Sequence, residues 1–321
     1  MDLSSTISNR WLNMIPTFVH PNHLTILNHL VVWSCLYLAY ATTWTAEHSI
    51  QRFVLMITIS VLAYASTVLD CLDGMWARKS GKTSKIGEFL DHYLDTIHIM
   101  ILTGTVAVIF DFPAWMLAAN MLLISTAYHI EILVLYDTKK FTTVAGVEGQ
   151  LFLSACVLLR AFAMILNISD PVSYTMSVVV SGIGSIGALV EIRKLCYKFS
   201  VIDDERMLHF IAHHFVLICI YLSGNIDRFS FIIAFSFLNL AQTGPFVGSH
   251  VLNVVHNHQN VILSRWFFVL GLKCIVESGE IWRNFWIWLP IIYLSGYSVR
   301  FLFDTIRKLG ASEREREREK R

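Results

Sequence analysis

The sequence predicts an all-α fold, a polytopic membrane helical bundle of about ten transmembrane helices with an N-terminal interfacial helix. Three observations lead to this prediction. Apolar residues make up 55% of the chain and charged residues only 15%, and the mean hydropathy is +0.56, values that do not describe a soluble globule. Apolar stretches of about 17 to 25 residues, the length that a helix needs to cross the hydrocarbon core, recur along the chain. Basic residues in the intervening loops favour one side of the membrane.

The N-terminal segment before Pro21 is predicted to form the interfacial helix. Its apolar residues at helical spacing are Ile7, Trp11, Ile15 and Phe18. This spacing suits a helix that lies in the plane of the interface, although an amphipathic lead-in without a function has the same pattern. The segment lacks the charged start and apolar core of a signal peptide.

Ten apolar stretches follow as predicted spans, and the ninth is short enough that the number could differ by one. They cover residues 24–43, 53–69, 93–110, 113–135, 151–166, 172–190, 207–222, 229–246, 266–276 and 285–303. With a cytosolic N-terminus, only Arg52, Arg228 and Arg283 among the loop basic residues fall on the opposite side. An even number of spans with both termini in the cytosol is therefore favoured.

No long linker or soluble domain interrupts this pattern. Residues 1–308 are predicted to form one membrane domain, and residues 309–321 a charged C-terminal tail that is either a solvated helix extension or disordered. The six cysteines show no CxxC pairing and are interpreted as packing residues. His129 in the fourth span is interpreted as an interhelical hydrogen-bonding or snorkelling residue rather than a functional one, and His213-His214 in the seventh as interfacial or packing residues rather than zinc ligands.

Four acidic residues cluster where the second span ends and the third begins. They are Asp70, Asp73, Asp91 and Asp95. Their spacings place the acids of each helix on one face, so a hairpin of the two helices would point all four carboxylates inward. Acids at membrane depth need compensating cations. Carboxylate oxygens suit Mg²⁺ or Mn²⁺, and four carboxylates can hold two such ions, which together can clamp a pyrophosphate.

Small residues and one arginine accompany the acids. Gly74, Ala77 and Gly87 share the helix faces of the acids and leave room for a ligand, while Arg78 offers a forked donor that suits phosphate. In the alternative interpretation, the acids form ordinary salt bridges at helix ends with nearby lysines. The lysines concerned are Lys79, Lys82 and Lys85. That interpretation does not explain the whole pattern, D-x2-D-G-x2-A-R-x8-G-x3-D-x3-D, which specifies eight residue identities.

The pattern matches the signature of the CDP-alcohol phosphotransferase family, and Pro21-Asn22-His23-Leu24-Thr25 resembles the P-N-x-L-T segment of the same family. The resemblance implies a membrane-embedded helical bundle in which the four acids bind two divalent cations that engage the pyrophosphate of a CDP-linked substrate. It also implies that Asp95, besides binding metal, is the candidate general base. The CDP-binding residues that it implies are Asn22, Thr25, Gly74, Ala77, Arg78 and Gly87.

Two further segments resemble the eukaryotic choline and ethanolamine phosphotransferases. Asp91-His92 is similar to their D-H dipeptide, which continues with glycine where this chain has Tyr93. The segment 145–149 resembles their G-P-x-E-G sequence, keeping Glu148 and Gly149 but departing at the first two positions. The resemblance makes His92 and Glu148 alternatives to Asp95 as the catalytic proton acceptor.

This branch of the family implies transfer of phosphoethanolamine or phosphocholine from CDP-ethanolamine or CDP-choline to diacylglycerol or a related lipid acceptor. Ceramide as the acceptor and CDP-diacylglycerol as the donor stay open, and so does a homodimer. The expected active site faces the cytosol, at the endoplasmic reticulum or Golgi in a eukaryotic cell, with no nucleic-acid partner. A polytopic transporter is the alternative from a different class, although the paired interrupted spans that it predicts are not seen.

Overall fold

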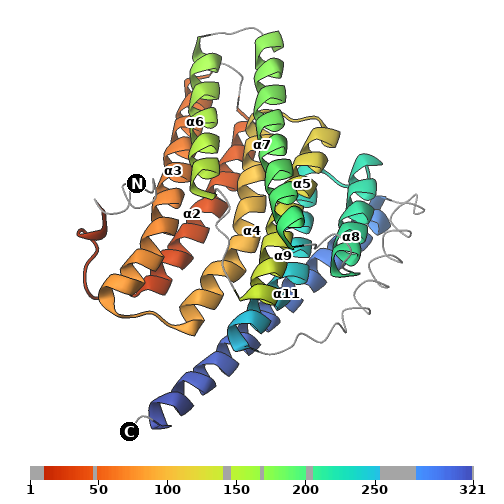
Figure 1. Cartoon of the computed structure of the whole chain (residues 1–321). Helices are drawn as coiled ribbons and strands as arrows, with labels where there is room; N and C mark the ends of the chain where they lie inside the picture. Colours follow the sequence, from red (N-terminus) through yellow and green to blue (C-terminus); the bar gives the residue numbers. More distant parts are fainter. Residues whose placement is uncertain are drawn as a thin grey trace. The chain divides into compact units, whose positions relative to one another are not determined.

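The computed structural model describes residues 11–45, 49–139, 146–166, 170–199, 205–253 and 280–319. Within these ranges the regular structure is entirely helical (Figure 1). The helices are α2 (Pro21–Thr42), α3 (Ile50–Ser80), α4 (Lys85–Ile109), α5 (Ala114–Thr138), α6 (Gly146–Ile165), α7 (Asp170–Phe199), α8 (Glu205–Leu222), α9 (Arg228–Leu252) and α11 (Glu280–Glu319).

Each predicted span that falls on described residues coincides with one of these helices, while the ninth, residues 266–276, lies outside them. Among the described helices, six are long and apolar enough to cross a bilayer: α2, α3, α4, α5, α9 and most of α7. Helices α6 and α8 are apolar over a shorter length. The prediction of an all-α polytopic membrane bundle is confirmed, and the chain is an integral membrane protein. Helix α11 runs to Glu319, so the described part of the predicted tail is helical.

The hairpin between α3 and α4 is the local feature that positions the acidic cluster. Helix α3 ends at Gly81, whose φ of 66° lies in the left-handed region that glycine adopts without steric cost. Helix α4 begins after Ser84, whose side chain accepts a hydrogen bond from the backbone N–H of Gly87 and so caps the helix. The two long helices are therefore joined by residues 81–84 alone.

The N-terminal segment, residues 11–20, lies against the last turns of α3. It is helical only at residues 11–12 and forms turns after them, because Pro16 has no N–H and interrupts the helix that the apolar spacing predicted. Leu12, Ile15 and Val19 pack against a buried cluster that includes Trp76. The indole N–H of Trp76 donates to the backbone oxygen of Val19 at 2.9 Å. The N-terminal half of the predicted interfacial helix, residues 1–10, lies outside the described residues.

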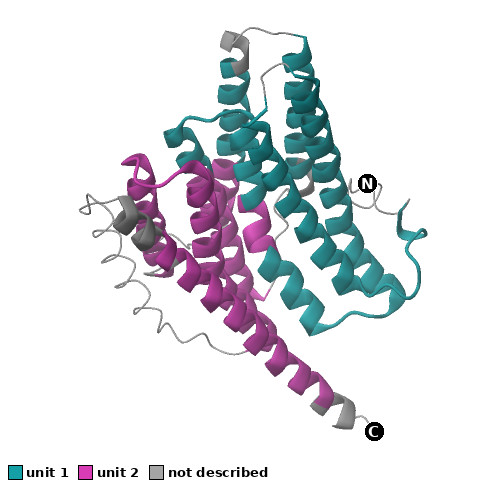
Figure 2. Ribbon diagram, turned by 180° about the vertical axis from the view of Figure 1, so that it is seen from behind, with its two compact units in different colours: residues 1–94, 101–120, 143–187 teal, residues 95–100, 121–142, 188–321 magenta. Residues whose placement is uncertain are grey.

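The chain forms two compact units (Figure 2). Unit 1 comprises residues 1–94, 101–120 and 143–187, and unit 2 comprises residues 95–100, 121–142 and 188–321. In unit 1, α3 packs against both α2 and α6. Ser60 of α3 and Ser154 of α6 each donate a hydroxyl hydrogen bond to the other's backbone oxygen, at 2.9 and 2.8 Å. Small polar residues of this kind let membrane helices approach closely.

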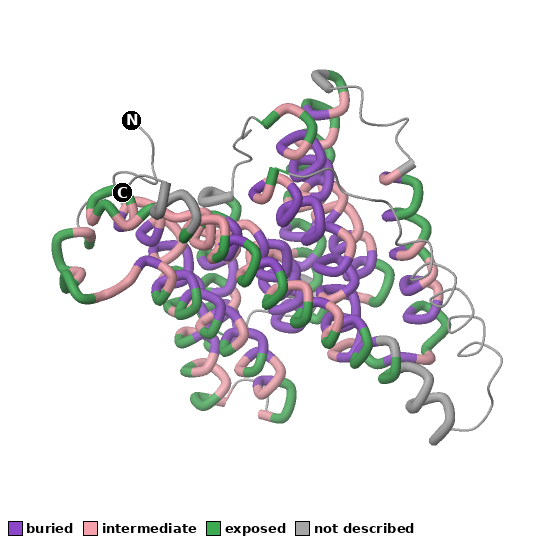
Figure 3. The backbone as a smooth tube through the Cα atoms, turned by 90° about the horizontal axis from the view of Figure 1, so that it is seen from below, coloured by how far each residue is buried: buried purple, intermediate pink, exposed green. Residues whose placement is uncertain are grey.

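Unit 2 contains a buried polar and aromatic core (burial is shown in Figure 3). The His129 ring stacks on Phe210 with centroids 4.0 Å apart, and its Nδ1 lies 2.9 Å from Thr243 Oγ1. The His214 ring packs against the ring of Phe235. These contacts agree with the packing and interhelical roles predicted for both histidines.

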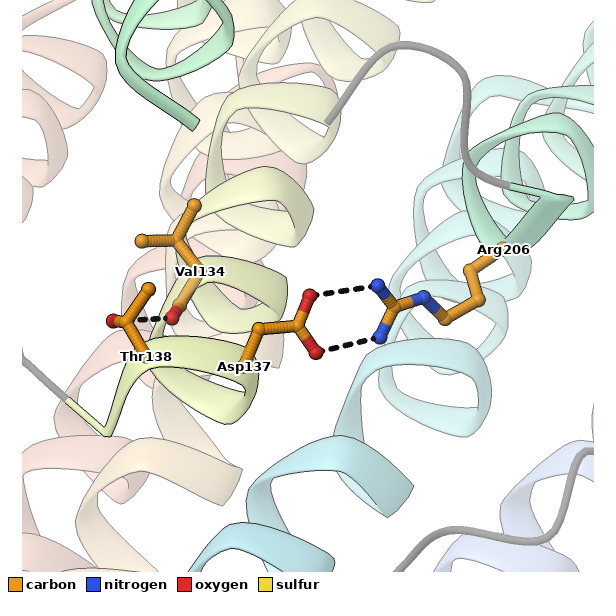
Figure 4. A network of polar contacts seen from close by, with 4 residues as sticks. All are labelled: Val134, Asp137, Thr138 and Arg206. Atoms are coloured by element: carbon orange, nitrogen blue, oxygen red, sulfur yellow. Dashed lines mark hydrogen bonds and ion pairs between the residues drawn. The ribbon is translucent and has the colours of Figure 1, made fainter. Parts of the chain in front are cut away.

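An ion pair connects α5 with α8 in unit 2. The guanidinium of Arg206 donates to both carboxylate oxygens of Asp137, at 3.0 and 2.7 Å (Figure 4). Next to it, the Thr138 hydroxyl donates to the Val134 backbone oxygen of its own helix at 2.7 Å.

Candidate active site

The acidic residues of the signature lie on α3 and α4 near the hairpin that joins them. With 31 residues, α3 is about 46 Å long, which exceeds the roughly 30 Å of a bilayer's hydrocarbon core. Asp70 lies ten residues before the helix end at Ser80, or about 15 Å. Asp91 lies six residues after the start of α4 at Lys85, or about 9 Å. The acids therefore lie toward the hairpin, near the C-terminus of α3 and near the N-terminus of α4.

Asp70 is bound by side chains from α2 and α6. The amide Nδ2 of Asn28 donates to Asp70 Oδ1 at 3.1 Å, and the Gln150 side chain hydrogen-bonds the same carboxylate. The Asn28 Oδ1 in turn accepts from the Ser66 hydroxyl at 2.6 Å. The orientation of Asp70 is thus set by neutral donors rather than by a salt bridge.

Asp73 has its own set of donors one turn further along α3. The hydroxyl of Thr25 donates to Asp73 Oδ2 at 2.6 Å, with both side chains buried. The backbone N–H of Gly74 donates to Oδ1. Arg78 interacts electrostatically with the Asp73 carboxylate, and its guanidinium lies over Gly74, where an added Cβ would be 3.4 Å from Arg78 Nη1. A methyl group at position 74 would therefore be in ordinary van der Waals contact with the arginine head group.

Asp91 brings α4 into this cluster. One of its carboxylate oxygens lies within 4.8 Å of an oxygen of Asp70. Asp95 follows one turn later along α4, at the spacing that places two residues on one helix face. Carboxylates this close repel one another unless a proton or a cation is shared between them. An all-oxygen donor set of this kind fits Mg²⁺ or Mn²⁺.

The start of α2 approaches α4 at Gly87. A Cβ added there would lie 3.1 Å from Asn22 Oδ1 and 3.3 Å from Ser84 Oγ. These distances are tighter than ordinary van der Waals contact, so glycine permits the close approach of Asn22. The structure thus brings the predicted residues Asn22 and Gly87 together.

The remaining predicted residues lie on the same helices. Ala77 is half-buried one turn after Asp73, and Arg78 is exposed. His92 is half-buried on α4, but as the next residue after Asp91 it leaves the helix about 100° away from it. Glu148 belongs to the first turn of α6, and its side chain lies outside what the structure describes. The roles assigned to all of these residues stay predictions.

The sequence did not single out the residues that orient Asp70. Asn28 follows Thr25 by three residues on α2, so a polar stripe in an otherwise apolar span was the signal that could have revealed it. Gln150 follows directly after the Glu148-Gly149 pair. Its contact with Asp70 shows that the start of α6 reaches the acids of α3.

Two of the lysines that could have neutralised the acids donate elsewhere. Lys79 Nζ donates to Asn13 Oδ1 at 2.6 Å, and Lys82 Nζ donates to the backbone oxygen of Thr17 at 3.1 Å. Both lysines therefore bind the N-terminal segment, which removes much of the support for ordinary salt bridges at the helix ends.

Comparison with known proteins gives one family and several relatives. The family model described as CDP-alcohol phosphatidyltransferase matches residues 18–183, just over half of the chain. Cholinephosphotransferase 1 of Danio rerio is 33% identical over 112 residues, which are 33% of this chain and 28% of the relative. The Xenopus laevis protein of the same name is 31% identical over 112 residues, covering 33% and 27%.

A third relative has a different name. CDP-diacylglycerol--serine O-phosphatidyltransferase of Encephalitozoon cuniculi is 29% identical over 140 residues, which are 42% of this chain and 34% of the relative. The matched regions thus span about a quarter to a third of the length of these relatives.

Proposed function

The chain belongs to the CDP-alcohol phosphatidyltransferase family, and on this premise we propose that it transfers phosphoethanolamine or phosphocholine from a CDP-linked donor to the hydroxyl of diacylglycerol. The observation that carries the proposal is the proximity of the Asp70 and Asp91 carboxylates from two helices. The complete signature surrounds this pair. Family membership also argues against the transporter considered from the sequence.

The reaction forms one bond and breaks one. The acceptor hydroxyl oxygen attacks the phosphorus that bears the alcohol, and the bond from this phosphorus to the bridging oxygen breaks, so that CMP leaves. The hydroxyl proton passes to a base on the protein. Asp95 is the proposed base, and His92 and Glu148 are the alternatives.

The other signature residues bind and orient the donor. Asp70, Asp73 and Asp91, with Asp95, would hold two divalent cations, Mg²⁺ or Mn²⁺. When bound, these ions would neutralise charge on the pyrophosphate and on the departing CMP. Thr25 keeps Asp73 in place through its hydroxyl. The remaining residues of the proposed CDP site are Asn22, Gly74, Ala77, Arg78 and Gly87.

A related reaction has support from one relative. The Encephalitozoon cuniculi protein carries a name that specifies CDP-diacylglycerol and serine, so a CDP-diacylglycerol donor is the second candidate. We further propose that the active site faces the cytosol, at the endoplasmic reticulum or Golgi of a eukaryotic cell, because the basic residues gather at the hairpin end of α3 and α4. We also propose that residues 1–308 form one membrane domain, that residues 309–321 form a tail, and that the protein is a homodimer.

The test is a transfer assay with the purified full chain in lipid nanodiscs. The donors are CDP-choline, CDP-ethanolamine and CDP-diacylglycerol. The acceptors are diacylglycerol or ceramide for the first two donors and serine for the third, and CMP and lipid product are measured. We expect phospholipid from CDP-choline or CDP-ethanolamine with diacylglycerol. Product from CDP-diacylglycerol and serine alone would instead establish the second candidate.

Two substitutions test the site itself. Asp91→Asn and Asp95→Asn should each lower the rate of CMP release by about 100-fold or more, as expected for loss of a ligand or a base. Asp137→Asn is the matched control, because Asp137 is an acid on another helix that pairs with Arg206. Near-normal CMP release by Asp91→Asn would refute the proposed function.

A further inference from the structure

Asp70 is held by a hydrogen-bonded bracket that comes from three helices. We define this bracket as Ser66 on α3, Asn28 on α2 and Gln150 on α6. All three residues and Asp70 belong to unit 1. None of the bracket residues is part of the acidic signature or of the family segments identified in the sequence.

The amide of Asn28 can point only one way in this bracket. Its side chain is fully buried, with 0% of its surface exposed. The Ser66 hydroxyl donates to Asn28 Oδ1 at 2.6 Å, and Asn28 Nδ2 donates to Asp70 Oδ1 at 3.1 Å. A flipped amide would place its oxygen against the Asp70 carboxylate, where two acceptors would repel. Ser66 therefore orients Asn28, and Asn28 orients Asp70.

The Gln150 side chain adds a second donor to Asp70 and leaves an amide oxygen that a bound ligand would satisfy. One end of its amide hydrogen-bonds Asp70. The other end, Oε1, is buried and has no hydrogen-bond partner in the part of the chain that the structure describes. A buried amide oxygen without a partner is costly. A hydrated divalent cation at Asp70 would supply a donor, because Mg²⁺ retains several of its waters.

We propose that Asn28 and Gln150 are positioning residues that hold the Asp70 carboxylate ready to bind a divalent cation. This inference rests on the proposed function and assigns the bracket a role within its metal site. Two neutral donors fix the carboxylate without neutralising its charge. A lysine or arginine in their place would orient Asp70 equally well but would compete with the cation for it. Partners that orient metal ligands in this way typically change metal affinity by roughly 10- to 100-fold when they are removed.

The experiment measures Mn²⁺ binding by the purified full chain in nanodiscs, without nucleotide, from the electron paramagnetic resonance signal of free Mn²⁺. Asn28→Leu keeps a similar side-chain volume and removes the amide. We expect it to raise the Kd for Mn²⁺ by roughly 10- to 100-fold. Gln150→Leu should weaken binding in the same direction. Ser66→Ala removes only the donor that orients Asn28 and should give a smaller increase.

Asn120→Leu is the matched control for a buried asparagine in a membrane helix. The Asn120 amide donates to Ser181 Oγ at 2.6 Å and to the Met116 backbone oxygen at 2.9 Å, in contacts away from the signature acids. We expect this variant to bind Mn²⁺ as the unchanged protein does. A thermal unfolding curve for every variant separates loss of the bracket from loss of the fold.

The outcomes distinguish this inference from the proposed function. An Mn²⁺ Kd that is unchanged in both Asn28→Leu and Gln150→Leu would overturn the inference, even if CMP transfer is observed. Equal weakening by Asn28→Leu and Asn120→Leu would also overturn it, because the effect would then reflect general packing. Failure of the unchanged protein to release CMP from any donor would refute the proposed function and leave the comparison of Mn²⁺ affinities valid.

Discussion

The hydrogen bond from Thr25 to Asp73 allows a quantitative test of the metal site. The Thr25 hydroxyl lies 2.6 Å from Asp73 Oδ2, and both side chains are only 4% exposed. A hydrogen bond to a charged group contributes roughly 1.5–3 kcal/mol, which corresponds to about 10- to 150-fold in an equilibrium constant. Thr25→Val keeps the shape of the side chain and removes this donor. We therefore expect the Mg²⁺ concentration for half-maximal activity to rise by about 10- to 150-fold.

The assay follows CMP release from the CDP-linked donor while Mg²⁺ is varied. Thr25→Ser retains the hydroxyl and should stay close to the unchanged protein. Thr67→Val is a second control, since the buried Thr67 hydroxyl donates at 3.1 Å to Ala63 of its own helix and not to an acid. The reasoning is refuted if Thr25→Val has an unchanged Mg²⁺ requirement, or if Thr67→Val shifts that requirement equally.

Three further predictions concern the surroundings of the acids and unit 2. Gly87→Ala should raise the KM for the CDP-linked donor several-fold, because the new Cβ would lie 3.1 Å from Asn22 Oδ1; an unchanged KM would show that Asn22 does not contact the donor. Chelation with EDTA should abolish CMP release, and Mg²⁺ or Mn²⁺ should restore it; chelator-resistant turnover would contradict the metal site. Asp137→Asn should lower the free energy of unfolding by no more than about 1 kcal/mol, because the Asp137 side chain is 44% exposed; thermal unfolding would contradict this estimate if it showed a much larger loss.

Sequence patterns predicted the helices well because the membrane limits the alternatives. Within the hydrocarbon core a chain must satisfy its backbone hydrogen bonds internally, so an apolar stretch of sufficient length is a helix. The predicted spans over residues 24–43 and 113–135 accordingly agree with α2 and α5 to within three residues at each end. The N-terminal segment was harder to predict. Its apolar spacing suggested a helix, but Pro16 and packing against α3 produce turns in the described part.

Hydropathy and residue spacing gave different ends for the second helix. The predicted apolar span stopped at residue 69, but the helical spacing of the acids predicted that the helix continues past Asp73, and α3 does continue to Ser80. The additional turns carry Asp73, Gly74 and Arg78. A hydropathy profile does not detect this extension, because a helix end with many polar residues has the same low hydropathy as a loop. The cap at Gly81 ends the helix instead.

The sequence by itself determined the family and the four acids, because the signature residues lie close together along the chain at helical spacings. Only the tertiary structure revealed what orients them. Asn28 is 42 residues from Asp70, and Thr25 is 48 residues from Asp73. Gln150 comes from a third helix. Contacts of this kind depend on how α2, α3 and α6 are rotated and packed against one another, and local spacing contains no information about that rotation.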